Sequence, residues 1–334
     1  MEKNLKILMI GSDRKLFDEG SAVSQRIKEY GNLVVELHII VFATRKHLRL
    51  LKIENSKLKI SNNVWVYPTN SLSRWFYPLD AIRIGKKIKA TIITTQDPFE
   101  CGWAGLKLKS ILKVPLEVQI HTDIFSPYFS GFQNKVRKFL ARTVLAKADK
   151  IRVVSNRIKD SLIERYPALA TKIEVRPIQV DIDRIKNTAV KTNLHDKYKQ
   201  FSKIILMASR LTKEKYIDLA IEAMPIILTK MPKVGLIIVG SGPEEEILKS
   251  KADKLRDNIV FEPWSDDLPS YYKTADLFLN TSLYEGYGMT LVEAKTVGCP
   301  VVSTDVGVAK EIGAKIISHF DPKLAAQEII ATLS

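Results

Sequence analysis

Short runs of aliphatic and β-branched residues alternate along the chain with longer stretches whose apolar residues recur at helical spacing. The runs are typical of buried strands, and the stretches are typical of amphipathic helices. In the first half of the chain the pattern predicts strands at 6–10, 34–42, 64–67, 91–95, 116–121 and 151–155, and helices at 21–30, 102–112, 133–146 and 156–166.

The second half repeats this alternation. It predicts strands at 204–208, 236–239, 259–261, 277–279 and 301–303, and helices at 214–228, 244–255, 290–297 and 323–333. Strands that alternate with helices form a parallel sheet with helices on both faces. The polar, lysine-rich stretch 181–203 between the halves is typical of a linker. We therefore expect an α/β protein of two doubly wound, Rossmann-like domains, 1–185 and 186–334, which face each other across a cleft.

The composition excludes several classes of protein. Hydrophobic residues make up 46% of the 334 residues, which indicates folded cores rather than disorder. No apolar run reaches the roughly 20 residues of a membrane span, and the apolar part of the first ten residues is too short for a signal peptide. Cys101 and Cys299 form no CxxC pair, so neither a zinc site nor a disulfide framework is indicated. These features favour a cytoplasmic protein that holds no metal.

The charge is unevenly distributed. Residues 1–170 contain 30 Lys and Arg against 15 Asp and Glu, whereas residues 201–334 contain 15 against 18. Such an asymmetry predicts an anionic partner for the front half, which could be a membrane surface, a nucleic acid or a phosphorylated substrate. The alternative is a basic surface that only keeps the protein soluble.

A glycine-containing loop follows the predicted strand 277–279 and leads into a helix. Gly286 and Gly288 allow the backbone to turn tightly and to approach a ligand closely. Unpaired N–H groups at the start of the helix favour a bound phosphate. The groups expected to point out of this helix start are those of Met289, Thr290 and Leu291.

Two glutamates flank the same helix start. Glu293 lies in the first turn, where a carboxylate can accept hydrogen bonds from a diol such as a ribose. Glu285 lies in the loop ahead of the helix, beside the rest of such a ligand. Either glutamate alone is equally well explained as a partner of the helix dipole or as a solvated residue. Together with the glycines after a strand, the pair predicts a ligand site.

Two cations follow the predicted strand 204–208. Arg210 stands at the strand end, and Lys215 is expected to enter the next helix, where a positive charge opposes the helix dipole unless an anion is bound. Two cations and a helix start could neutralise a diphosphate without a metal. Gly242, in the Gly-Ser-Gly-Pro turn after strand 236–239, is a weaker candidate for the same site.

These segments resemble the nucleotide-sugar domain of the retaining GT-B glycosyltransferases of family 4, also described as glycosyl transferases group 1. SRLTKEK is similar to the GRL…K segment of that family, IVGSGPEEEIL to its GxGPxxxxL turn, and LYEGYGMTLVEAKTVGCPVVST to its E-x7-E motif. The front half is similar more diffusely, through LKILMIGS…DEGSAVSQRI and ITTQDPFECGW…PLEVQIHTD.

The resemblance implies a role for each matching residue. Arg210 and Lys215 would hold the donor diphosphate, and Glu293 would bind the ribose. Glu285 would contact hydroxyls of the transferred sugar. His121, which from its position alone would be assigned a structural role, would contact the donor sugar near the reacting centre from the wall of the front domain.

The chain departs from the family pattern at two positions. Gly20 stands in the loop that closes near the donor phosphate and the acceptor in relatives, but Asp-Glu-Gly-Ser replaces the usual paired glycines. Tyr216 stands where many relatives have a glycine after the lysine. The sequence Asp181-Ile182-Asp183 looks like a DxD metal motif, but it falls in the expected linker, and we interpret it as structural.

The implied reaction is transfer of a sugar, with retention, from a UDP- or GDP-linked donor to an acceptor hydroxyl, with no metal or other cofactor required. Aromatic residues between 124 and 132 lead into a basic helical stretch, NKVRKFLARTVLAKA, a combination that favours peripheral contact with an anionic membrane. The acceptor would then be lipid-linked or a cell-envelope glycan precursor, met on the inner face of the membrane. The alternative is that the apolar face of this helix belongs to the core.

Other functions remain open at this stage. A nucleotide-sugar 2-epimerase shares the two-domain architecture, and a basic nucleic-acid-binding protein would share the charge, although no nucleic-acid-binding motif is recognisable. A binding protein without turnover would keep the same motifs.

Overall fold

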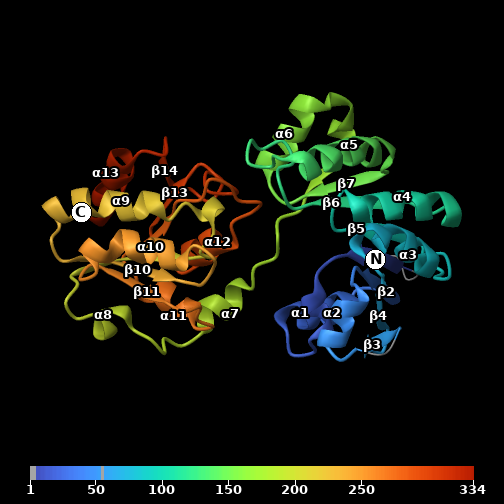
Figure 1. The fold of residues 1–334 in the computed structure, drawn as a ribbon, viewed down its shortest axis with the longest axis horizontal. Coiled ribbons are helices and arrows are strands. Elements are labelled where there is room, and N and C mark those ends of the chain that lie inside the picture. Colours follow the sequence, from blue (N-terminus) through green and yellow to red (C-terminus); the bar gives the residue numbers. More distant parts are fainter. Residues whose placement is uncertain (1–4, 54–55) are drawn as a thin grey trace. The chain divides into compact units, whose positions relative to one another are not determined.

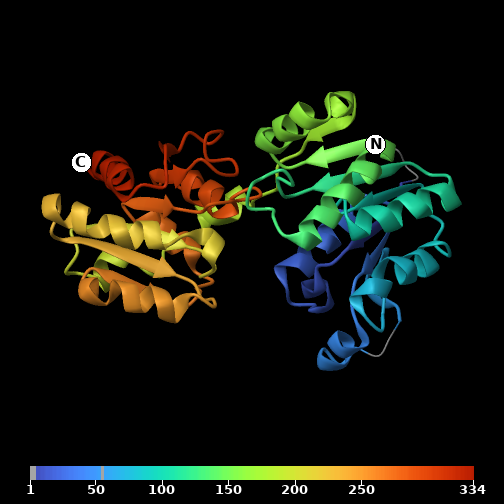
Figure 2. The same cartoon turned by 45° about the horizontal axis from the view of Figure 1, so that its top comes forward.

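The structure is a computed structural model that describes residues 5–53 and 56–334. The chain forms two compact units, Met1–Arg176 and Pro177–Ser334, called the N-terminal and C-terminal units below. Each unit contains its own mainly parallel sheet with helices beside it (Figures 1 and 2), so the predicted α/β fold class is confirmed. The first predicted strand begins at Lys6. Our prediction about a signal peptide also covered residues 1–4, which lie outside the described residues.

The N-terminal unit is built on eight strands in the order β3-β4-β2-β1-β5-β6-β7-β8. All neighbouring strands are parallel except β3 and β4. The six strands predicted here are present, and two short edge strands were not predicted. The bounds are β1 (Lys6–Gly11), β2 (Glu36–Val41), β3 (Leu58–Ser61), β4 (Val64–Pro68), β5 (Ile92–Thr95), β6 (Leu116–Ile120), β7 (Lys150–Val153) and β8 (Ile173–Val175).

Small residues let the helices of this unit pack closely. A Cβ atom on Gly85 would lie 2.5 Å from Cδ1 of Leu108, and one on Gly102 would lie 2.9 Å from Cγ1 of Val144. The helix at 100–112 therefore contacts the helices on both sides of it, and the three form one layer. The helices are α1 (Ala22–Gly31), α2 (Arg45–Leu50), α3 (Tyr77–Gly85), α4 (Glu100–Leu112), α5 (Phe132–Lys147) and α6 (Asn156–Arg165), with shorter 3-10 turns η1 (Arg14–Phe17), η2 (Arg74–Phe76) and η3 (Pro167–Lys172).

The C-terminal unit is built on six parallel strands in the order β11-β10-β9-β12-β13-β14. The strands are β9 (Lys203–Ala208), β10 (Val234–Val239), β11 (Ile259–Glu262), β12 (Leu277–Asn280), β13 (Val301–Thr304) and β14 (Lys315–Ile317). The helices are α7 (Ile182–Asn187), α8 (Leu194–Lys197), α9 (Asp218–Lys230), α10 (Glu245–Ala252), α11 (Leu268–Thr274), α12 (Met289–Thr296) and α13 (Pro322–Leu333), with η4 (Lys213–Lys215) and η5 (Asp253–Leu255).

The stretch 181–203, expected to be a linker, is instead an ordered part of the C-terminal unit. Asp181 caps α7 by accepting a hydrogen bond from the N–H of Arg184 at 2.9 Å. Lys273 donates to the carbonyl of Lys186 at 2.7 Å, and Leu194 is fully buried. Polar composition misled the prediction because α7 and α8 are short and each buries a single residue, Ile185 and Leu194 respectively, which is too few to give a clear apolar period. The units separate between residues 176 and 177, nine positions before the boundary we expected.

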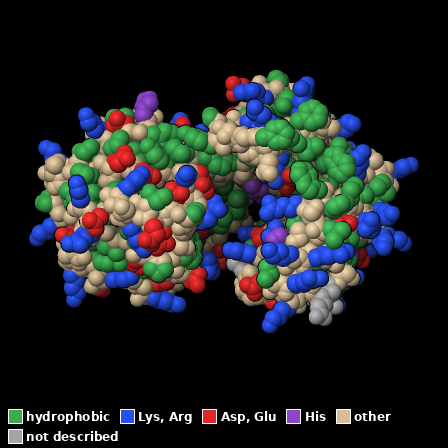
Figure 3. All heavy atoms as spheres, viewed as in Figure 1, with side chains coloured by type: hydrophobic (Ala, Val, Ile, Leu, Met, Phe, Trp, Pro, Cys, Tyr) green, Lys and Arg blue, Asp and Glu red, His purple; other side chains and the backbone are tan. Residues whose placement is uncertain are grey.

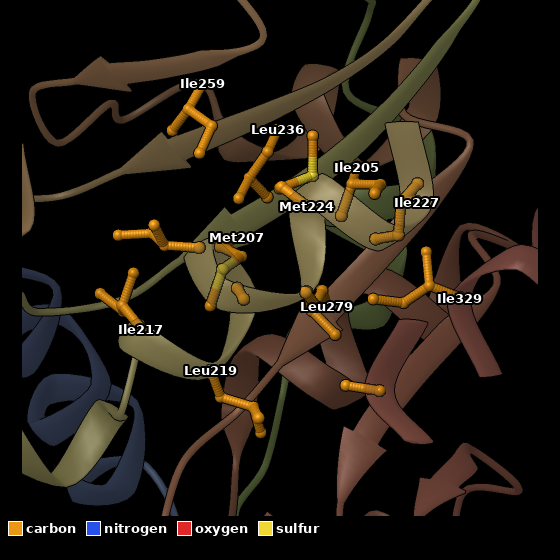
Figure 4. Close-up of a cluster of buried hydrophobic side chains, with 14 of the residues drawn as sticks. Ile205, Met207, Ile217, Leu219, Met224, Ile227, Leu236, Ile259, Leu279 and Ile329 are labelled. Atoms are coloured by element: carbon orange, nitrogen blue, oxygen red, sulfur yellow. The ribbon is translucent and has the colours of Figure 1, made fainter. Parts of the chain in front are cut away.

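The core of the C-terminal unit lies on both faces of its sheet. Every residue of β10 is buried, which explains its uninterrupted apolar sequence VGLIIV. Figure 4 shows Leu236 among side chains from β9, α9 and α13, including Ile205, Met224 and Ile329. This double-sided packing fixes the strand ends from which the candidate site is built.

We expect Leu236→Ala to lower the free energy of unfolding by about 2–5 kcal/mol, because it removes a buried side chain and leaves a cavity. Ile247→Ala, at an exposed position on α10, is the control and should change it by less than about 0.5 kcal/mol. Urea unfolding monitored by circular dichroism measures both. Equal effects of the two substitutions would contradict the assignment of Leu236 to the core.

Candidate functional site

The candidate residues of the C-terminal unit lie at the carboxyl edge of its sheet. The chain leaves β9 towards β10 and β11 on one side and returns on the other side of β9 as β12 and β13. The loops after β9 and β12 therefore diverge at a topological switch point, where open α/β sheets bind ligands. Residues 209–217 and 281–288, which include the predicted site residues Arg210, Lys215, Glu285 and Gly288, are these two loops.

Backbone hydrogen bonds tie the two loops together. The N–H of Leu283 donates to the carbonyl of Glu214 at 2.8 Å, and the hydroxyl of Thr281 donates to the carbonyl of Lys215 at 3.0 Å. Both contacts join segments that are almost 70 positions apart in the sequence. They fix the position of Lys215 relative to the loop that follows β12.

Lys215 and Glu285 form an ion pair in this setting. Nζ of Lys215 lies 2.5 Å from Oε1 of Glu285, and the two side chains are only 13% and 16% exposed. A pair so little exposed is screened weakly by solvent, and removal of either partner leaves an uncompensated charge. The structure thus brings together two residues that we predicted from separate motifs.

The carboxylate of Glu285 has a second donor that the sequence did not indicate. The hydroxyl of Ser282 lies 2.9 Å from Oε1 of Glu285 and 2.8 Å from Oδ1 of Asn280. The carbonyl of Ser282 accepts from Thr304 at 2.6 Å. Within the described part of the chain, Oε1 of Glu285 is engaged and nothing donates to Oε2, so Oε2 can accept from a ligand hydroxyl. The polar residues at the ends of β12 and β13 were the only feature of the sequence that could have indicated this second donor.

Lys215 does not begin a helix, contrary to our expectation. It ends the 3-10 turn η4, and α9 begins only at Asp218. The prediction that Lys215 opposes the dipole of the next helix is therefore wrong. The first turn of α9 contains an acidic residue, Asp218, which is favourable at that end of the dipole. Arg210 is 74% exposed and pairs with Glu214 at 3.3 Å, so in this structure its guanidinium contacts a surface carboxylate.

Tyr216 adopts a backbone conformation that favours glycine. Its φ of 43° and ψ of 48° are left-handed, a conformation that is costly for a residue with a side chain. Its ring meets that of Phe320 edge-on, with centroids 5.8 Å apart. The chain therefore keeps the turn that the family pattern requires and adds an aromatic contact.

The helix start at α12 offers fewer free N–H groups than expected. Gly288 caps the helix with a φ of 90°, a value that favours glycine. The N–H of Leu291 donates to the carbonyl of Gly288 at 3.1 Å, so this N–H is not free as we expected, and contact of Leu291 with a ligand stays a prediction. The N–H groups of Met289 and Thr290 have no acceptor among residues 5–53 and 56–334, and they remain able to bind a phosphate.

Glu293 is held by a buried tyrosine. The hydroxyl of Tyr272, on α11, donates to Oε2 of Glu293 at 3.0 Å. Burial raises the pKa of Glu293, while the Tyr272 hydrogen bond and the positive charge of Arg184 act to lower it. Oε1 has no donor among the residues that the structure describes, so this oxygen can accept from a diol. Sequence reasoning missed Tyr272 because it lies on a helix that we did not predict.

Gly242 has a structural reason to be a glycine. A Cβ atom there would lie 2.3 Å from the carbonyl oxygen of Leu211, and the N–H of Leu211 donates to the carbonyl of Ser241 at 2.9 Å. The close approach of these two loops supports the backbone next to Arg210. Contact of Gly242 with a ligand stays a prediction.

His121 and Gly20 belong to the N-terminal unit. His121 directly follows β6, and its Nε2 lies 3.1 Å from Oε1 of Gln119. Burial lowers the pKa of His121 to about 4, and the positive charges of Arg152 and Arg26 act in the same direction. The imidazole is therefore neutral at pH 7. Gly20 lies in the turn before α1, where an added Cβ would meet only Oδ1 of Asp18, at 3.6 Å, so the turn itself does not require a glycine.

Two findings concern metals and membranes. Among the described residues, no group of three or more His, Cys, Asp or Glu is arranged to hold a metal ion, and Asp181 serves as the cap of α7. Within the same residues, no helix has the length and apolar character that crossing a bilayer requires.

Two family descriptions match most of the chain. "Glycosyltransferase Family 4" matches residues 25–184, and "Glycosyl transferases group 1" matches residues 191–333. These matches follow the division into two units.

Individual relatives match the chain with moderate sequence identity. An alpha-monoglucosyldiacylglycerol synthase of Streptococcus pneumoniae is 28% identical over 67% of this chain and 54% of its own length. The lipopolysaccharide core biosynthesis mannosyltransferase LpsB of Rhizobium meliloti is 29% identical over 61% of this chain and 56% of its own length. The chain thus spans little more than half of these two relatives.

Solved structures share the fold. HepE of Anabaena in complex with UDP-glucose has a TM-score of 0.75 and 20% identity, covering 98% of this chain and 89% of its own. Sucrose-phosphate synthase of Thermosynechococcus elongatus has a TM-score of 0.74 and 17% identity, covering 98% and 90%.

We expect Tyr272→Phe to raise the pKa of Glu293 further, because one hydrogen bond to the ionised form is lost. A carbon-13 NMR titration of the glutamate carboxyls measures this shift. Tyr271→Phe is the matched control, because the hydroxyl of Tyr271 donates to Glu262 instead, at 2.7 Å. An unchanged Glu293 titration in Tyr272→Phe would show that the hydrogen bond has no effect on this carboxylate.

Proposed function

Because the chain belongs to the family 4 glycosyltransferases of GT-B fold, we propose that it transfers a sugar, with retention, from a UDP- or GDP-sugar to an acceptor hydroxyl. The acceptor is a lipid-linked or cell-envelope glycan precursor, and the enzyme works peripherally on the inner face of the membrane. The observation that carries this proposal is the Lys215–Glu285 pair beside the free N–H groups of α12.

In this proposal the donor lies along the carboxyl edge of the C-terminal unit. Lys215 and Arg210 bind the diphosphate together with the N–H groups of Met289 and Thr290. An ammonium group has three donors, so Lys215 can contact a phosphate while it keeps its bond to Glu285. The free carboxylate oxygen of Glu293 accepts from the ribose. Support for these roles comes from the family match and from the geometry of the two loops.

Catalysis rests on stabilisation of the leaving group. As the bond between the anomeric carbon and the donor oxygen breaks, negative charge grows on the diphosphate and positive charge on the sugar ring. The cations and amides stabilise that negative charge without a metal. The leaving oxygen takes the proton of the acceptor hydroxyl, which attacks from the same face, so the configuration is retained. The neutral imidazole of His121 acts as a hydrogen-bonding partner of the donor sugar and not as a cation.

The acceptor assignment is supported by charge and by relatives. The N-terminal unit carries 32 Lys and Arg against 16 Asp and Glu, whereas residues 177–334 carry 20 against 21. One relative is named an alpha-monoglucosyldiacylglycerol synthase, and another is named a lipopolysaccharide core biosynthesis mannosyltransferase. A basic unit suits an acceptor presented on an anionic surface.

Lys215→Ala should lower turnover by about tenfold or more, because it removes a cation that stabilises the leaving diphosphate and leaves Glu285 to repel it. Release of nucleoside diphosphate from the donor measures the rate. Lys213→Ala is the matched control, since Lys213 lies in the same turn and is exposed. Turnover close to the wild type in Lys215→Ala would remove the proposed role.

A panel of UDP- and GDP-sugars identifies the donor by thermal shift. A donor at 100 times its dissociation constant should add about 2.7 kcal/mol of apparent stability, and sugars linked to the wrong base should add far less. Glu293→Ala should weaken the shift because the ribose contact is lost. Appearance of an epimerised nucleotide sugar during the same incubation would favour the epimerase instead.

A further inference from the structure

One outer surface of the N-terminal unit is formed by the layer of α3, α4 and α5. Figure 1 shows these helices next to one another, and α4 contacts both of the others. Each helix connects parallel strands and therefore begins at the carboxyl edge of the sheet, where His121 follows β6. The starts of the helices and the candidate sugar-contacting histidine thus share one edge of the unit.

The start of α5 exposes an apolar stripe. Phe132 is 81% exposed and Phe139 is 70% exposed, with Val136 between them. The spacing of these residues places them on one face of the helix. The buried face of α5 is formed by other residues, among them Ala141 and Val144, so the stripe is not part of the core.

A second exposed apolar cluster lies around the start of α3, and our reading of the sequence did not single it out. Trp75 is 88% exposed in the turn η2, and Leu72, Phe76 and Leu79 beside it are also exposed. These residues belong to one short segment, and four large apolar side chains left in water at one place are unfavourable. Such clusters mark a surface that another molecule covers.

The aromatic loop before α5 contributes less than its sequence suggested. The ring of Phe129 stacks on that of Phe99 with centroids 5.4 Å apart. Phe125 packs against Tyr166, and Ile124 is buried. These residues of the loop therefore support the fold, whereas Tyr128 in the same loop is exposed.

The charge of the layer identifies the partner. Residues 72–87, 100–113 and 132–147 contain twelve Lys and Arg and only two acidic residues. Both acidic residues are paired, Asp80 with Arg83 at 3.3 Å and Glu100 with Arg137 at 3.1 Å. Figure 3 shows hydrophobic side chains gathered over α4 and α5 with Lys and Arg around them. Arg83, Arg137 and also Lys109, which pairs with Asp149 at 2.7 Å, have acidic partners, and the net charge of these stretches remains positive. Exposed aromatic residues within such a positive field match an anionic lipid surface.

We propose that this surface inserts into an anionic bilayer through two elements, the stripe Phe132–Val136–Phe139 and the Trp75 cluster of Leu72, Trp75, Phe76 and Leu79. The proposal rests on the proposed function in that it names where a membrane-borne acceptor meets the enzyme. Insertion at the carboxyl edge brings the lipid headgroups to the same edge as His121. Contact through two separate elements also fixes the orientation of the unit on the bilayer. Contact through a single helix would leave the unit free to rotate about that helix.

Sedimentation with vesicles tests the proposal in the absence of any nucleotide sugar, so its outcome does not depend on turnover. We expect the wild type to bind vesicles of phosphatidylcholine with phosphatidylglycerol, and to bind them less as salt is added. Trp75→Ser should weaken binding by about fivefold or more, and the Trp75→Ser/Phe139→Ser pair by more than about tenfold. Brominated lipid should quench tryptophan fluorescence in the wild type and much less in Trp75→Phe.

Two controls separate membrane insertion through this surface from other effects of the substitutions. Ile247→Ser changes an exposed apolar residue of the C-terminal unit and should leave vesicle binding unchanged. Donor-induced thermal shift should stay the same in Trp75→Ser, since Trp75 lies outside the donor site. Failure of the wild type to bind anionic vesicles, or binding by Trp75→Ser as tight as the wild type, would overturn the proposal. Loss of donor binding in the wild type would instead count against the proposed function.

Discussion

The contact between Lys215 and Glu285 sets the shape of the candidate site. Each residue lies in a loop outside the sheet, so the pair joins two segments that are far apart in the sequence. The loops are fixed by hydrogen bonds that cross from Leu283 to Glu214 and from Thr281 to Lys215. Those bonds in turn depend on the buried strands β9 and β12, which end side by side at the switch point of the sheet. The geometry of the site therefore depends on the order of the strands in the sheet as much as on the two charged residues.

Sequence reasoning found the parts of the protein that repeat a simple physical pattern. The strands with continuous apolar runs were predicted because they are buried on both faces, as β10 is. Lys215 and Glu285 were singled out because charged residues that follow strands gather at one edge of a parallel sheet. The edge strands, and helices α7, α8 and α11, escaped prediction because each is too short to show a clear apolar period, although α11 buries Tyr271 and Tyr272 in the core.

The supporting residues of the site could not be derived in the same way. Ser282 and Tyr272 act through single hydrogen bonds to Glu285 and Glu293, and no spacing rule connects them to those glutamates. The true start of α9 depended on the left-handed backbone of Tyr216, a conformation that a tyrosine rarely adopts. The pairing of the Leu291 amide likewise depended on how tightly the first turn of α12 closes. Such details belong to local geometry rather than to composition.

The internal counter-ion of Lys215 has a consequence for the end of the catalytic cycle. A lysine whose charge is already balanced by Glu285 attracts a nucleoside diphosphate less strongly than a lone buried cation would. Among the described residues, the start of α12 offers two free amides, those of Met289 and Thr290. Under the proposed function, we therefore expect the nucleotide product to be released quickly after each transfer.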